Sequence, residues 1–249
     1  MINKICFTKL SGIVPALVAL IVAGCGGGGG GPPPPTGPVT STLSFPLLSA
    51  DTTQTANGFS FTLNANGDGS VLANGDCTGT INGTQGPAKT ATTFEGAPAL
   101  SATRVTTINF TNCFEDDVPA TIAQTSILYY TTTYSPLGYQ ITGSEYAVFT
   151  SGPAIPTTVM VGDAGVIGSE TIYTDSTKTV IVGSQDMSFV VEPDTANTAI
   201  INISFKLYNA ASVLEFTEQD RYRITSAGAL TLISIDLQRV SPPLHIVFK

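Results

Sequence analysis

The sequence predicts an all-β domain, an antiparallel meander of about a dozen strands that forms a partly closed barrel or a sandwich. Short runs of alternating apolar and polar residues recur along the chain, separated by Gly, Asn, Asp and Pro. Charged residues make up only 11% of the chain, while Thr, Ser, Val and Ile abound. This composition favours strands over helices.

The clearest strand is expected over residues 199–208, where apolar side chains occupy every second position and one face should be buried. A hairpin is expected from the runs 59–63 and 70–72, which flank an Asn- and Gly-rich turn. A longer hairpin is expected from the runs 127–134 and 139–149, which flank a turn that contains proline.

Two local irregularities are expected within this pattern. The apolar positions change phase within residues 230–240, and a β-bulge near Leu232 and Ile233 would reconcile the two halves. No window has convincing helical periodicity, and only a single helical turn is expected, at residues 119–124. A sub-boundary between two β units is placed near residues 115–121.

Residues 1–24 have the three parts of an export signal. Lys4 and Lys9 give a positive start, residues 13–22 form an apolar run, and the small pair Ala23-Gly24 follows. The run is shorter than the roughly 20 apolar residues that span a bilayer as a helix. We therefore expect a removable signal peptide rather than a permanent membrane helix.

The segment Val22-Ala23-Gly24-Cys25 resembles the lipobox of bacterial lipoproteins, in which two small residues precede the cysteine that becomes the mature N-terminus. Val22 stands where that family more often has Leu. The resemblance covers residues 1–25 only and implies a diacylglyceryl thioether and an N-acyl group on Cys25. Two or more acyl chains make membrane attachment stable. Gly26 is not the Asp associated with inner-membrane retention in enteric bacteria, so the resemblance implies the periplasmic face of the outer membrane.

Residues 25–38 read CGGGGGGPPPPTGP and are expected to be a disordered tether. Gly gives flexibility, Pro favours the extended polyproline II conformation, and at about 3.1 Å per residue the segment would reach up to roughly 40 Å. The β-rich domain is expected over residues 39–249.

The charge of the chain excludes one class of partner. The sequence has 10 Lys and Arg against 18 Asp and Glu, and loss of Lys4 and Lys9 with the signal changes the formal charge from −8 to −10. Such an acidic chain lacks the basic surface that nucleic-acid binding requires. Anionic lipid head groups would also repel it, so we expect contact with the membrane through the acyl anchor.

Two of the four cysteines remain for other roles once Cys6 leaves with the signal and Cys25 is acylated. In the oxidising environment outside the cytoplasm, Cys77 and Cys113 are expected to form a disulfide. The chain-entropy model gives roughly 3–4 kcal/mol for closing a loop of about 36 residues.

Two segments have oxygen ligands of the kind that calcium prefers, although no metal site is expected. Asn64, Asn66 and Asp68 occupy alternate positions as in the first half of a calcium-binding loop, but Gly75 stands where the final Glu should be. A plain hairpin turn is favoured there, and weak calcium binding is the alternative. The acidic run Glu115-Asp116-Asp117 is interpreted as a solvated loop.

Arg221 and Arg223 would project from the same face of a strand. They could clamp an anion, because the guanidinium group matches the geometry of carboxylate and phosphate. Cross-strand pairing with acids such as Glu192 or Asp236 is the favoured alternative.

No catalytic set is apparent, and enzyme activity is not expected. His245 is the only histidine, and no Gly-x-Ser-x-Gly motif accompanies it. The spacing of carboxylates does not exclude glycoside hydrolysis, but the chain has no Trp to stack on a sugar.

The favoured function is a non-catalytic structural or interaction module of the cell envelope, anchored by lipid and without another cofactor. The alternative is a carrier of a hydrophobic ligand such as a lipid, held by the apolar concave face of a half-closed sheet. The residues expected to line that cavity are Ile201, Ile203, Phe205, Leu232 and Ile235. An enzyme is the third hypothesis.

Overall fold

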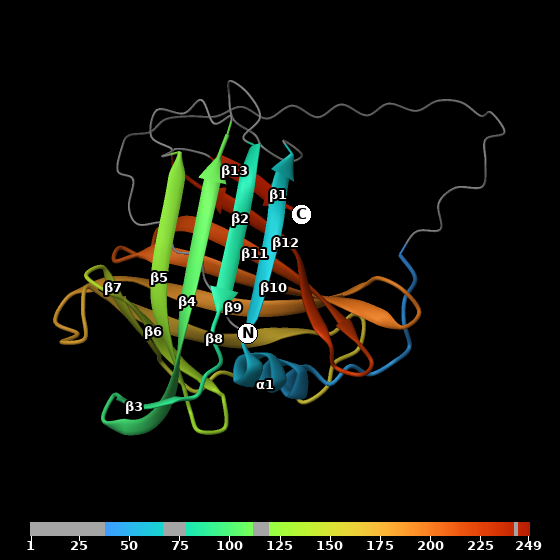
Figure 1. The fold of residues 1–249 in the computed structure, drawn as a ribbon, viewed down its shortest axis with the longest axis horizontal. Coiled ribbons are helices and arrows are strands. Elements are labelled where there is room, and N and C mark those ends of the chain that lie inside the picture. The colour runs from blue at the N-terminus through green and yellow to red at the C-terminus, as the bar shows by residue number, and fades with distance from the viewer. Residues whose placement is uncertain (1–37, 67–77, 112–119, 242–243) are drawn as a thin grey trace.

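A computed structural model of the chain describes residues 38–66, 78–111, 120–241 and 244–249 (Figure 1). These residues form one helix and thirteen strands, all paired antiparallel. The helix is α1 (Leu47–Asn57), and the strands are β1 (Phe59–Asn66), β2 (Thr78–Gln85), β3 (Thr90–Phe94), β4 (Ala97–Phe110), β5 (Thr121–Tyr130), β6 (Pro136–Ile141), β7 (Glu145–Phe149), β8 (Ala164–Tyr173), β9 (Ile181–Pro193), β10 (Thr198–Asn209), β11 (Leu214–Thr225), β12 (Leu230–Arg239) and β13 (Leu244–Phe248).

All strands belong to one sheet with meander order. Each strand pairs with the next along the chain, except that β3 pairs only with β4, on the stretch that β2 leaves free. The sheet curls until β1 approaches β13, where Asn64 and Lys249 exchange two backbone hydrogen bonds of 2.9 Å. This nearly closed, barrel-like sheet confirms the predicted all-β fold.

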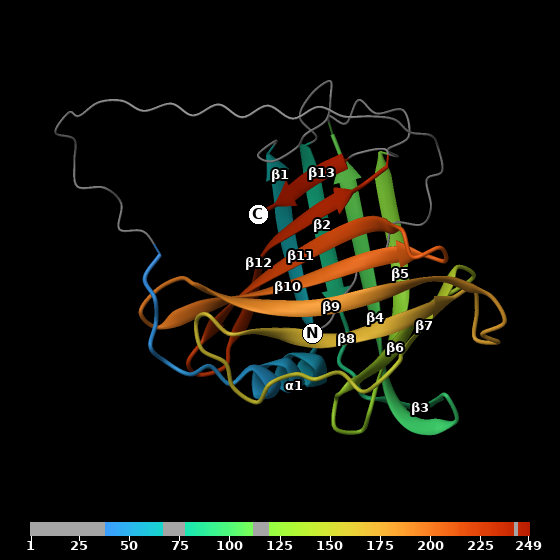
Figure 2. The same ribbon diagram turned by 180° about the vertical axis from the view of Figure 1, so that it is seen from behind.

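The sheet is bent into two layers whose strands cross. Strands β1, β2, β4 and β5 stand upright at the front of Figure 1, and β8 to β13 run across them behind; Figure 2 shows the same layers from the other side. Helix α1 lies across the lower end of the layers in both views. Inward-facing side chains of the two layers fill the space between them, as in other crossed sheets.

Strand β10 buries the face that its sequence predicts, although Ile200 and Asn202 on the opposite face are buried as well. Ile201, Ile203 and Phe205 face inward and are buried, whereas Lys206 is exposed. Burial of one face of the strand supplies the hydrophobic stabilisation that orders its backbone.

The predicted bulge is present in β12. The pairing of this strand with β11 shifts between Ser234, which lies opposite Arg221, and Leu232, which lies opposite Tyr222. Ile233 is therefore the extra residue, and the phase change between the two apolar halves of β12 is explained.

The predicted hairpins differ in detail from the observed strands. Strand β1 pairs with β2, while residues 70–72 lie outside the described residues. A turn divides residues 139–149 into β6 and β7, so the longer hairpin is a three-stranded meander with β5. Strands β4 and β5 pair with each other, so the sheet continues across the sub-boundary placed near residues 115–121.

Helix α1 was not predicted, because only a single helical turn was expected in the chain. Its buried residues are Leu47, Ala50, Asp51 and Thr55, of which two are polar. The apolar stripe that would reveal a helix in the sequence is therefore weak. The helical turn expected at residues 119–124 is wrong, because β5 begins at Thr121.

Gly58 allows the chain to pass from α1 directly into β1. Its φ is 73°, and its amide donates a hydrogen bond of 2.8 Å to the Gln54 carbonyl, which ends the helix. A Cβ at this position would lie 2.4 Å from the Gln85 carbonyl oxygen. Both the left-handed backbone and the close approach therefore require glycine.

Two hydrophobic clusters fill the interior. The larger includes Phe45, Ile108 and Phe248, and the smaller includes Ala102 and Leu128. On β4, the stretch between Ala102 and Ile108 separates the two clusters, and its inward-facing residues are polar.

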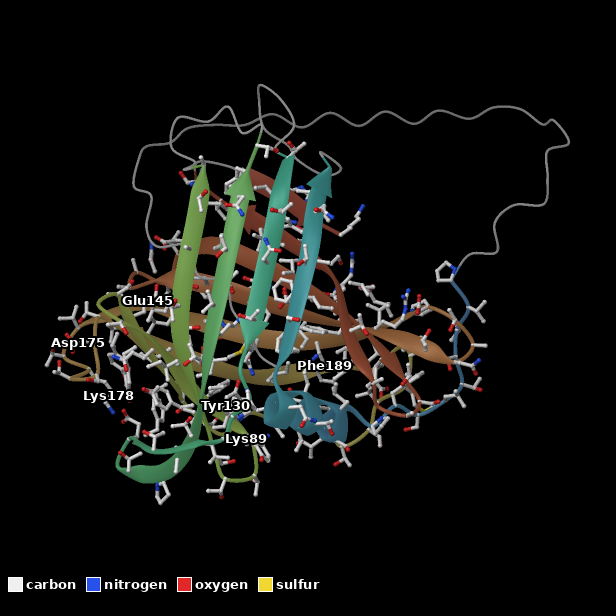
Figure 3. All side chains as sticks on the ribbon, viewed as in Figure 1. Lys89, Tyr130, Glu145, Asp175, Lys178 and Phe189 are labelled. Carbon is white, nitrogen blue, oxygen red and sulfur yellow. The ribbon has the colours of Figure 1, made fainter. Side chains whose placement is uncertain are left out.

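A third, small cluster on the sheet ties the β3–β4 hairpin to its neighbours. The Phe94 ring stacks on Tyr129 at 4.5 Å between centroids and lies 5.4 Å from the Tyr146 ring. The Tyr146 hydroxyl donates to Glu95 Oε1 at 2.7 Å, and the Lys178 ammonium, labelled in Figure 3 on the β8–β9 loop, pairs with the same carboxylate. These interactions lower the pKa of Glu95.

Candidate functional site

A layer of polar side chains crosses the interior of the sheet, and we call it the polar layer. Each of its side chains is at most 7% exposed, although polar groups are rarely buried unless they are paired. The members are Gln85, Arg104, Ser126 and Tyr130 from the front layer of strands, and Glu170, Gln185, Glu218, Asp220 and Tyr222 from the layer behind.

The front half of the polar layer is aligned by strand register. Arg104 on β4 lies opposite Gln85 on β2 and opposite Ser126 on β5, so the three face inward side by side. The Gln85 Nε2 group donates to the Tyr130 hydroxyl at 3.2 Å, and Figure 3 labels Tyr130 on β5.

The rear half of the polar layer lies on β8, β9 and β11. Glu218, Asp220 and Tyr222 occupy alternate positions of β11 and therefore share its inward face. Glu170 on β8 lies opposite Gln185 on β9. Arg104 on β4 is buried on the inward face of its own strand, and its charge acts to lower the pKa values of Asp220 and Tyr222.

Sequence reasoning missed the polar layer, although the signal was present. The alternation that buries Tyr222 and Ile224 also places Asp220 on the inward face of the same strand. The alternation that buries Ile108 likewise places Arg104 inside.

Several polar atoms of this layer have no hydrogen-bond partner among the described residues. They are Arg104 Nε and Nη1, both amide atoms of Gln185, Gln85 Oε1 and Asp220 Oδ1. A buried polar atom without a partner costs roughly 1–3 kcal/mol. So many in one layer distinguish it from an ordinary protein interior.

Asp220 is the most perturbed acid of the layer. Burial raises its pKa to about 7, against the lowering effects of the Arg104 charge and of hydrogen bonds from Glu218 and Tyr222. The Tyr222 hydroxyl lies 3.4 Å from Asp220 Oδ2. Burial and the neighbouring Asp220 charge raise the pKa of Tyr222, so this phenol keeps its proton and can donate a hydrogen bond to the carboxylate.

A cavity of about 20 Å³ lies against the polar layer, between β5 and β9. Its polar lining includes Ser126, Tyr130, Glu170 and Gln185. Since a single water needs at least roughly 10–15 Å³ by the same measure, this cavity has space for about one water molecule.

The predicted anion clamp is occupied by carboxylates of the chain itself. Arg223 makes a bidentate pair with Asp194, with Nε–Oδ2 2.7 Å and Nη2–Oδ1 3.1 Å. Arg221 Nε lies 3.3 Å from Glu192 Oε2, so the cross-strand alternative that named Glu192 is observed. Asn202 donates to the same carboxylate at 2.7 Å. Neither guanidinium group is therefore directed at an external anion.

His245 lies on β13 and pairs with Asp236 rather than with a nucleophile. Its Nε2 is 2.9 Å from Asp236 Oδ1, which also accepts a hydrogen bond of 3.2 Å from Gln238. Among the described residues, no hydroxyl or thiol group shares a hydrogen bond with the imidazole. Such a pair lacks the third group of a nucleophilic triad.

The residues expected to line a lipid cavity pack into the larger hydrophobic cluster. Ile201, Ile203, Phe205, Leu232 and Ile235 are all buried there. Ile201 and Ile203 do border an apolar cavity near α1, whose lining also includes Phe189 (labelled in Figure 3), but the volume of this cavity is about 20 Å³. A lipid site typically needs several hundred Å³, so this conformation has no space for an acyl chain at these residues.

Several predicted sites lie wholly or partly outside the described residues. Among them are Cys25, Cys77, Cys113, Asp68 and the run Glu115-Asp116-Asp117. Asn64 and Asn66 belong to β1, where their backbones pair with Thr80 and Thr78 of β2. Within the described part of the chain, no group of three or more His, Cys, Asp or Glu side chains could hold a metal ion.

The disulfide between Cys77 and Cys113 stays a prediction with a clear test. Thr78 directly follows Cys77, Thr111 lies two residues before Cys113, and the hydroxyl oxygens of the two threonines are 2.8 Å apart. We expect the oxidised chain to resist thiol alkylation at these two residues until it is reduced. Peptide mass analysis would check this, and alkylation of both residues without reduction would contradict it.

Among the described residues, no helix has the length and apolar character needed to cross a membrane. Compared with protein-family models, with curated proteins and with solved structures, the chain shows no match.

Proposed function

We propose that the chain is an exported lipoprotein whose β-domain is a non-catalytic structural or interaction module, held at the periplasmic face of a bacterial outer membrane. The segment Val22-Ala23-Gly24-Cys25 and the Gly- and Pro-rich tether at residues 25–38 support this location. The anchor on Cys25 would be the only non-protein group that the function requires.

The observation that carries the module hypothesis is the filled interior of the sheet. Side chains of the chain itself occupy the space between the layers, and the two cavities described above each have room for about one water. A partner would therefore meet the outer surface. A carrier of lipids, the alternative, would need α1 or the β1–β13 junction to open before an acyl chain could enter.

The geometry of the domain entrance is consistent with a tethered module. Val39, directly after the tether, donates a backbone hydrogen bond of 3.2 Å to Asp194, and Phe45 exchanges backbone hydrogen bonds with Val159. The chain that leaves the tether is therefore fixed to the β-domain at once, and a pull on the tether would act on the β9 end of the sheet.

Metabolic labelling with an alkyne fatty acid tests the anchor. We expect the wild-type chain to incorporate the label and to partition into detergent, and Cys25→Ala to lose both properties, because the thioether and the acylated amine depend on that cysteine. Cys6→Ala is the matched control, since Cys6 lies within the predicted signal and its loss should leave labelling unchanged. Undiminished labelling of Cys25→Ala would refute the proposal.

A further inference from the structure

Strand β1 is the first strand of the sheet, and only part of its free side is paired. Its other side pairs with β2 along the whole strand, without a bulge. On the free side, the Asn64 amide and carbonyl both bond to Lys249, which follows the last residue of β13. Figure 1 shows β1 at the right-hand end of the upright strands, with the C-terminus beside its upper half. The lower half of β1 extends beyond this contact.

The backbone of this lower half has hydrogen-bonding groups that point away from β2. Within an antiparallel strand, the amide and carbonyl of every second residue point to the same side. Ser60 and Thr62 therefore direct their backbone groups to the same side as Asn64. Among the described residues these groups have no backbone partner, and both residues are exposed. We call residues 59–63 the open edge.

The open edge lacks the features by which proteins usually keep an edge strand from pairing with another chain. Such strands are short, carry Lys or Pro, or are interrupted by a bulge. Residues 59–63 read FSFTL, with no charge and no Pro, and their register with β2 is regular. Strand β3 provides a contrast, because it also has an unpaired side but is only five residues long and directly follows the exposed Lys89, labelled in Figure 3.

We propose that the open edge accepts an extended segment of a partner protein as an additional strand, antiparallel to β1 and in line with β13. The added strand would gain backbone hydrogen bonds from Ser60 and Thr62, and its alternate side chains would determine specificity. Neither β1 nor β2 has a charged residue, and Phe59 and Phe61 are half-buried. The segment that fits is therefore uncharged, with apolar residues beside the two rings and hydroxyl residues on the outer face. This inference specifies how the interaction module proposed above binds its partner, and so it rests on that part of the proposed function.

A second copy of β1 does not fit the open edge as a free segment does. Helix α1 is joined to β1 by the single residue Gly58. If two β1 strands paired antiparallel through Ser60 and Thr62, Gly58 of the second copy would lie opposite Asn64. Lys249 already occupies that position, and the helix of the second copy would follow directly. An extended segment that is not preceded by a helix avoids this conflict.

A strand added to the full chain tests the proposal. Appending Val-Thr-Val-Thr-Val after Lys249 continues the line of β13 and places the second and fourth added residues opposite Thr62 and Ser60. The direct linkage gives the added strand a high effective concentration at the open edge. The matched control is Val-Pro-Val-Pro-Val, because proline has no amide to donate at these two positions.

Hydrogen exchange of single backbone amides, followed by NMR, measures the pairing. In the original chain, we expect the Ser60 and Thr62 amides to exchange rapidly and those of Phe61 and Leu63, which point to β2, to exchange slowly. The Val-Thr-Val-Thr-Val chain should slow exchange at Ser60 and Thr62 by at least about tenfold, and the proline control should not.

Three results would overturn the proposal. The first is unchanged exchange at Ser60 and Thr62 in the Val-Thr-Val-Thr-Val chain. The second is slow exchange of these amides in the original chain at every concentration, which would mean that the chain itself covers the edge. The third is slow exchange that appears only as the concentration of the original chain rises, which would identify a second copy as the occupant. Fatty-acid labelling at Cys25 is read separately, so each of these results leaves the proposed anchor untouched.

Discussion

An Arg104→Ala chain is expected to lose roughly 3–5 kcal/mol of unfolding free energy at pH 8, because removing one partner of a buried ion pair leaves uncompensated charge behind. Arg104 is only 2% exposed, and its charge acts to lower the pKa of the buried Asp220. Unfolding by urea, followed by circular dichroism, would measure the loss.

The matched control is Arg223→Ala, which removes the same side chain from the outer face of the sheet. Arg223 is 47% exposed and its pair with Asp194 is partly solvated, so we expect a loss within about 1 kcal/mol. Asp220→Asn should recover part of the loss in an Arg104→Ala background, since it removes a charge left behind. If Arg104→Ala and Arg223→Ala lose the same free energy of unfolding, the burial of the Arg104 charge does not determine its contribution to stability.

Phe248→Ala is expected to destabilise the domain by roughly 3–5 kcal/mol, the usual effect of truncating a buried phenylalanine. The Phe248 ring is fully buried in the larger hydrophobic cluster, on the strand whose end meets β1. The cavity left behind would lie beside the junction that closes the sheet. Thermal unfolding would report the change as a lower Tm.

Val247→Ala is the control for the closing strand. Val247 precedes Phe248 on β13 and faces the other side of the sheet, where it is only partly buried. Its truncation should cost less than half as much. A similar loss for both variants would mean that β13 is stabilised by its backbone hydrogen bonds rather than by packing against the interior.

The inward face of a single strand could be predicted from the sequence, because every second side chain of a strand points to the same face and the buried face is apolar. The inward face of β10 and the bulge at Ile233 were predicted in this way. Which run pairs with which could not be predicted in every case, since alternation does not record register. For example, the run at residues 59–63 was matched with residues 70–72, whereas β1 pairs with β2, which begins at Thr78.

The helix and the polar layer escaped prediction for one shared reason. Asp51 and Thr55 in α1, and Arg104 and Asp220 in the strands, are buried polar residues, so they weaken the hydrophobic pattern that marks an inward face. Their burial becomes favourable only when partners from other elements are in place. Such tertiary pairing is not visible in a local window of sequence.

The hydrogen bonds between Asn64 and Lys249 join the first strand of the sheet to the last. During synthesis, the contact between β1 and the C-terminal end of the chain can form only after β13 has been made, so the sheet closes last. Contacts between segments so far apart along the chain are slow to form, because loop closure comes before any gain from pairing. A partly made chain would present the unpaired edge of β1, which is open to association with other strands. The domain is thus expected to depend on protection from aggregation until its synthesis is complete.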